Sequence, residues 1–178
     1  MISKVPSFEQ AINASMLWCK AWDEGEISDE VLADRVAELL ASRNGARGFF
    51  VVSLSSDSPL LDRLSDPLAI KLRAAGSSII DLTVRNLAMS TAMALDHGRK
   101  ANITQQIASE RIKTRCLEIL RLLDPAGVKN RLERLLEATK GTGEDLAFLN
   151  KWNYDSEQRN AIAKSVNAVA EFSKKKGS

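Results

Sequence analysis

The sequence predicts an all-α protein, on the basis of its composition, the spacing of its apolar residues and the placement of its helix-capping residues. Of its 178 residues 44% are hydrophobic, yet only 5% are aromatic. Alanine, leucine and isoleucine dominate the apolar set, and these residues favour helices over the strands of an all-β protein. We expect a single domain, residues 1–178, built as a bundle of about seven to eight helices around a central helix at 79–97, which is rich in small residues.

Residues 1–44 predict an N-terminal helical hairpin. Ser7 is a typical N-cap, and the first helix should run from there to about Glu24. Its buried stripe is expected to consist of Phe8, Ile12, Met16, Cys19 and Trp22. A second helix should begin at Ser28, with acidic residues in its first turn, and stop at Asn44 and Gly45.

Residues 46–173 are expected to form the main bundle, and residues 174–178 a disordered tail. Within the bundle, Phe49 to Leu54 (FFVVSL) is the one stretch with strand-like content. No β-rich partner exists in the chain, so it is a short buried helix, a lone extended segment, or an edge that pairs with its own copy. We favour the buried helix, because four consecutive apolar residues indicate burial on all sides. Further helices are expected at 59–64, 67–74, 103–123, 128–139, 144–152 and from Asp155 onward.

The central helix has two different faces. On a helical wheel one continuous arc is apolar or small and should face the core; it consists of Ala94, Leu87, Ile80, Thr91, Val84, Leu95 and Ala88. The second face carries the candidate binding residues Asp81, Arg85, Met89, Met93 and His97. If Arg85 is buried, Asp81 is spaced at i,i+4 to neutralise it. This second face is either a binding surface or a face closed by other helices of the same chain.

Charge is unevenly distributed along the chain. Residues 1–98 hold 9 Lys/Arg against 13 Asp/Glu, whereas residues 99–140 hold 10 against 5. The candidate basic face consists of Arg111, Lys113, Arg115, Arg131 and Arg134. Such a face can bind an acidic protein partner, set the register between two subunits or contact nucleic acid. Nucleic acid is the least favoured partner, because no helix-turn-helix continuation and no interleaved aromatic residues accompany these cations.

Sequence motifs for metal binding, phosphate binding and serine hydrolase catalysis are absent. One histidine and two separated cysteines argue against a metal centre, and no glycine-rich phosphate loop or GxSxG turn occurs. Cys19 and Cys116 each lie on the apolar side of a predicted helix, which indicates buried, reduced thiols. We therefore expect no enzymatic activity, no metal and no cofactor.

No window of the sequence is long and apolar enough to span a membrane, and the N-terminus has no apolar signal region. These observations predict a soluble, cytoplasmic protein without a membrane partner.

Two stretches, NLAMSTAMALDH (86–97) and FLNKWNYDSEQRNAI (148–162), resemble members of an uncharacterised all-helical family found in cyanobacteria. The similarity extends from about Gly48 to Ala163. It implies a source and an all-helical fold, and it carries no functional residues.

The leading functional hypothesis is a non-enzymatic protein that acts through protein interaction as a regulator or adaptor, as a homodimer. The alternative is a helical carrier or sensor that holds an apolar or pigment-like small molecule with Arg85 and His97 as polar anchors. Nucleic-acid binding is the third hypothesis, and it predicts affinity that falls steeply with salt.

Overall fold

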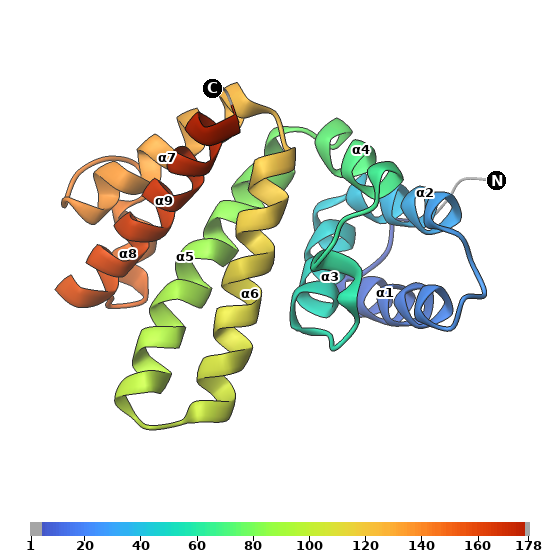
Figure 1. Cartoon of the computed structure of the whole chain (residues 1–178), viewed down its shortest axis with the longest axis horizontal. Coiled ribbons are helices and arrows are strands. Elements are labelled where there is room, and N and C mark those ends of the chain that lie inside the picture. The colour runs from blue at the N-terminus through green and yellow to red at the C-terminus, as the bar shows by residue number, and fades with distance from the viewer. Residues whose placement is uncertain (1–4, 177–178) are drawn as a thin grey trace. The chain divides into compact units, whose positions relative to one another are not determined.

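The computed structural model describes residues 5–176, with side chains from 5 to 169, and every regular element in this part of the chain is a helix (Figure 1). This confirms the all-α prediction. The α-helices are α1 (Phe8–Asp23), α2 (Asp29–Leu40), α3 (Arg43–Ser55), α4 (Asp66–Ala74), α5 (Ser77–Arg99), α6 (Ile103–Leu122), α7 (Pro125–Thr139), α8 (Leu146–Lys151) and α9 (Ser156–Lys176), and a 3₁₀ turn, η1, covers Pro59–Leu61.

These helices gather into two compact units, one ending at Leu82 and the other beginning at Thr83. The boundary falls inside α5, whose first turns belong to the first unit and whose remainder belongs to the second. That the whole chain is one domain stays a prediction.

In the first unit, α1 packs against α3, while α2 contacts both α3 and α4. The helix ends follow the capping rules: Ser7 and Gln10 form a reciprocal capping box at the start of α1. The contact between α1 and α3 is made through small residues, since a Cβ on Gly48 would lie 2.5 Å from the Cβ of Ala11. Ala11 and Ser15 therefore face α3, whereas Met16, predicted to be buried, is 57% exposed.

The second and third helices meet at a tighter corner than the sequence predicts. The predicted stop at Asn44 and Gly45 is wrong: α2 ends at Leu40, and Ser42 caps α3 by accepting a hydrogen bond from the Gly45 amide at 3.1 Å. A Cβ on Gly45 would lie 1.9 Å from the Leu39 carbonyl oxygen. This glycine therefore permits a close approach at a helix start and does not terminate a helix.

The FFVVSL stretch is helical, as predicted, and lies in the last turns of α3. Phe49 and Phe50 are fully buried and their rings meet edge to face. Val51, however, is 51% exposed, so the expectation of burial on all sides is wrong.

In the second unit, α6 contacts both α7 and α9, and α7 contacts α8 and α9. α5 lies between α6 and α9 (Figure 1). On one side a Cβ at Gly98 would meet the Gln106 side chain of α6 at 3.0 Å. On the other side the buried Gln158 of α9 donates a hydrogen bond to the Ala92 carbonyl at 3.2 Å.

The predicted core arc of α5 is confirmed: Val84, Leu87 and Ala88 are completely buried, and only Leu95 is half-buried. The helix extends to Arg99, so His97 and Gly98 do not end it as expected. The chain leaves α5 through Ala101 at φ 54°, and the Asn102 amide donates to the His97 carbonyl at 2.9 Å. A left-handed alanine thus closes this helix end where glycine is the common residue.

The two halves of α6 are buried to different extents. Ala108 is exposed and Ile112 is half-buried, whereas Ser109 and Arg115 are buried. The first two turns instead expose Ile103 and Ile107. In the C-terminal half Cys116, Ile119 and Leu120 are buried, as is Leu123 directly after the helix.

Candidate functional site

The side of α5 opposite its core arc is open to solvent over several turns in the second unit. We call this surface the α5 face and define it by Arg85, Met89, Met93, Asp96 and His97. Arg85 and Met93 are exposed, Met93 at 46%, and the other three are half-buried. The described helices of the chain therefore do not close this face.

Neighbouring groups hold the charged ends of the α5 face. The Arg85 guanidinium lies 5.4 Å from the centroid of the Phe148 ring of α8, a cation–π distance. At the other end, Asp96 accepts a hydrogen bond from the Lys100 ammonium at 2.8 Å. That hydrogen bond lowers the pKa of Asp96, with smaller contributions from the nearby charges of Lys100, His97 and Arg99. The face thus presents a cation and a carboxylate at fixed positions, with methionines between them.

Asp81 does not belong to this arrangement. It is half-buried and lies on the first-unit side of the boundary within α5. Arg85 is exposed, so the burial that would require neutralisation by Asp81 is not present. The i,i+4 ion pair between Asp81 and Arg85 stays a prediction. Of the five candidate residues, the structure places Arg85, Met89, Met93 and His97 on one face of the second unit.

A pair of ionic contacts joins the end of α5 to the start of α9. The Arg99 guanidinium lies 2.7 Å from Asp155 and 2.7 Å from Glu157. The hydrogen bond from Arg99, together with that from the Gln158 amide, lowers the pKa of Asp155 to about 2. Asp155 also caps α9 through this amide at 2.9 Å. The contacts fix the side of α5 that borders the α5 face.

The predicted basic face is wrong for two of its five members. Arg115 is 1% exposed and Arg131 is 6% exposed, while Lys113 and Arg134 are half-buried and Arg111 is exposed. Arg131 forms a buried ion pair with Asp145, the residue that precedes α8. Burial of a guanidinium requires such a partner, because its desolvation is costly.

Arg134 extends the same cluster. It lies 3.3 Å from Asp145 and 3.1 Å from the exposed Glu144. The cations of α7 therefore hold the loop before α8 in place, and they do not form a solvent-facing strip together with those of α6.

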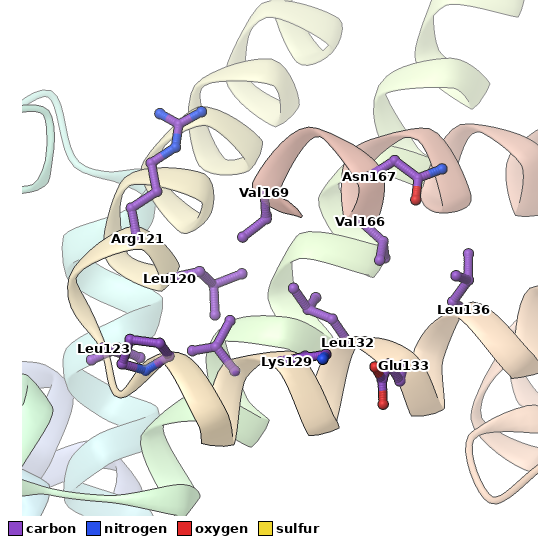
Figure 2. A pocket seen from close by; sticks show the side chains of 12 residues that line it. Leu120, Arg121, Leu123, Lys129, Leu132, Glu133, Leu136, Val166, Asn167 and Val169 are labelled. Atoms are coloured by element: carbon purple, nitrogen blue, oxygen red, sulfur yellow. The ribbon is translucent and has the colours of Figure 1, made fainter. Parts of the chain in front are cut away.

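An apolar pocket that the sequence does not reveal lies between α6, α7 and α9 (Figure 2). Its volume is about 420 Å³, within the range of small-molecule sites. It is lined by Leu120, Arg121, Leu123, Pro125, Val128, Lys129, Leu132, Glu133, Leu136, Val166, Asn167 and Val169. None of the candidate residues of α5 is among them. The apolar stripes of the three helices were visible in the sequence, but their packing leaves a gap that only the structure shows.

The cysteines are free and buried, as predicted. Burial, with a smaller contribution from Asp23, raises the pKa of Cys19 to about 11, and burial raises the pKa of Cys116 well above its usual range. Both thiols are therefore protonated at neutral pH and are poor nucleophiles.

Within the described residues, no cluster of three or more His, Cys, Asp or Glu side chains is arranged to hold a metal ion. No described helix combines the length and apolar character needed to cross a bilayer.

Comparison with known proteins identifies a family for this chain. No curated protein and no solved structure matches the chain. Residues 7–169 match a family model, which covers nearly all of the described chain. This agrees with the resemblance to an uncharacterised all-helical family, although the cyanobacterial source stays a prediction. The chain belongs to the family described as Uncharacterised conserved protein UCP020893.

Proposed function

We propose that this protein acts without catalysis, by binding a protein partner through the α5 face. The observation that carries the proposal is the exposure of Met93 and Arg85 on a helix whose opposite side is buried except for Leu95. The open side of an ordinary amphipathic helix carries polar and charged residues, whereas this side also carries Met89 and Met93.

The residue types on the α5 face suit protein recognition. Methionine side chains are flexible and polarisable, and they adapt to the surface of a partner. Arg85 and Asp96 flank them, which gives an apolar centre with charged residues at its edge, as in typical interfaces.

Site-specific photocrosslinking tests this proposal. The photoreactive residue p-benzoylphenylalanine is placed at Met93, and in a control at Lys164, an exposed residue of α9. We expect a discrete protein adduct in cells from position 93 and none from position 164. No adduct from position 93, or equal adducts from both positions, would contradict the proposal.

The pocket between α6, α7 and α9 supports a second candidate function, a carrier or sensor of an apolar small molecule. Its lining is aliphatic apart from Arg121, Lys129, Glu133 and Asn167, so a planar aromatic or pigment-like ligand would find no stacking partner there. Arg85 and His97, the anchors expected from the sequence, are not part of this pocket.

Native mass spectrometry of the purified protein tests the carrier function. A bound aliphatic molecule that Leu132→Trp displaces would support it, because the larger ring fills the pocket. A ligand-free spectrum, together with no change in melting temperature on addition of fatty acids or hydrocarbons, would rule it out.

Nucleic-acid binding receives no support from the geometry. Arg115 and Arg131 are buried and cannot contact phosphates from outside, so two of the five expected cations are lost.

A further inference from the structure

We propose that the partner of the α5 face is a second copy of the same chain, packed with its α5 antiparallel about a two-fold axis. This inference rests on the proposed function, since it names the occupant of the same surface. A two-fold interface requires one patch to be complementary to itself, so the order of residues along the α5 face decides whether a second copy fits.

The apolar centre of the face satisfies this requirement. Met89 and Met93 lie one helical turn apart on the same side of α5. A two-fold axis that passes midway between them brings Met89 of one copy against Met93 of the other, twice. The most exposed apolar side chain of α5, Met93, is then covered by an identical helix.

The charges are placed symmetrically about the same point. Arg85 lies six residues before the midpoint of the two methionines, and Asp96 lies five residues after it. In an antiparallel pair these two positions face each other with an offset of one residue, about 1.5 Å along the helix. The reach of an arginine side chain spans such an offset. A parallel pair would instead align Arg85 with Arg85 and Asp96 with Asp96, which costs free energy.

The neighbours of both charges are compatible with this pairing. Phe148 supports the Arg85 guanidinium on one side, and Lys100, directly after α5, forms an ion pair with Asp96. The partner's Arg85 would join the Lys100–Asp96 pair in a small network at the edge of the interface. A partner of unrelated sequence would not require a cation and a carboxylate at nearly equal distances from one apolar centre, and this symmetry is what favours a second copy.

Reciprocal charge reversal tests the inference on the full chain. In Arg85→Glu alone or in Asp96→Arg alone, like charges face each other at both ends, and we expect the dissociation constant of self-association to rise about tenfold or more. An equimolar mixture of the two variants restores an opposite charge at every contact, so it should form a heterodimer with near wild-type affinity. The matched control is Lys164→Glu, an exposed charge change on α9 that should leave self-association unchanged.

Sedimentation and native mass spectrometry of the mixture distinguish the outcomes. A variant that combines Arg85→Glu and Asp96→Arg provides a second test in case one of the single variants does not fold, because opposite charges face each other in its homodimer. Recovery of a heterodimer, and of a homodimer by the combined variant, supports the inference. A wild-type monomer, or reversals that do not rescue each other, overturns it. If the wild type is monomeric while position 93 still crosslinks another protein, the proposed function survives and only the second copy is excluded.

Discussion

Single side chains determine how closely α1 and α3 approach. A Cβ on Gly48 would lie 2.5 Å from the Ala11 Cβ and 2.9 Å from the Ala11 carbonyl carbon, and neither group can move without shifting a helix. We predict that Gly48→Ala lowers the free energy of unfolding by about 1 to 3 kcal/mol through overpacking. Urea unfolding followed by tryptophan fluorescence measures the change.

Gly98→Ala is the matched control for Gly48→Ala. Its Cβ would meet only the flexible Gln106 side chain, at 3.0 Å, and α5 gains helix propensity. We expect this variant to be neutral or slightly stabilised. Equal losses in both variants would show that general helix effects, and not the close contact at Ala11, explain the result.

Asp155 makes stability depend on acid pH. Its pKa in the folded protein is lowered to about 2, mainly by the hydrogen bond from Arg99, from a usual value of 3.8. The stabilisation is therefore complete above the usual value and is lost as the pH falls from about 4 towards 2. Asp155→Asn retains a cap for α9 but not the charge, so it should be less stable at neutral pH and lose less stability across this window.

Unfolding curves recorded at a series of pH values test this prediction. Wild type and Asp155→Asn should converge as the pH falls through the window. Curves that stay parallel from neutral pH to pH 2 would exclude a contribution from the Asp155 charge.

The buried ion pair of Arg131 and Asp145 should make the stability of the protein sensitive to a conservative substitution of Asp145. Their side chains are 7% and 4% exposed, so Asp145→Asn leaves a buried guanidinium without full compensation. We predict a loss of about 3 to 5 kcal/mol in the free energy of unfolding. The control Glu144→Gln removes a 77% exposed charge beside Arg134 and should cost less than about 1 kcal/mol.

Denaturant midpoints of these two variants and the wild type provide the test. A loss in Asp145→Asn no greater than that in Glu144→Gln would show that the pair is not a stabilising contact. The sequence could not reveal this pair, because Arg131 and Asp145 lie 14 residues apart and meet only when the loop before α8 folds back onto α7.

At the level of elements, α5 combines a packed face and an open face in one helix. Ala88 is completely buried, while Met93 on the other side is 46% exposed. We predict that Ala88→Leu destabilises the protein by about 1 to 3 kcal/mol, whereas Met93→Leu changes stability by less than about 0.5 kcal/mol. Thermal unfolding monitored by circular dichroism measures the stability of both variants. Equal melting temperatures for Ala88→Leu and Met93→Leu would show that Ala88 does not face the core.

The sequence predicts which segments are helical more reliably than it predicts where each helix ends. Apolar spacing located the core arc of α5, and Ser7 and Ser28 marked the starts of α1 and α2. The predicted helix stop at Gly45 is wrong, because a glycine that permits close approach looks the same in sequence as one that ends a helix. The sequence leaves two alternatives for the exposed side of α5, a binding surface or a closed face, because only the position of α6, α8 and α9 around it decides its exposure.

At the level of the whole molecule, the all-α class followed from composition, but the division into two units inside a continuous helix did not. No glycine, proline or charge run marks the boundary at Leu82 and Thr83, so a sequence pattern had nothing to detect. The prediction of a basic face in the middle of the chain is wrong for Arg115 and Arg131 for a related reason. Net charge along the sequence does not show that Arg115 and Arg131 are buried.

The proposed dimer rests on the α5 face, where the exposed Met93 and the half-buried Met89 lie between a cation and a carboxylate. Sedimentation velocity of wild type and Met93→Glu over the micromolar range tests this account most directly. We predict a concentration-dependent dimer for the wild type and a folded monomer for Met93→Glu, since a carboxylate at the apolar centre would be buried without a partner. A wild type that stays monomeric throughout, or a Met93→Glu variant that dimerises equally well, would contradict it.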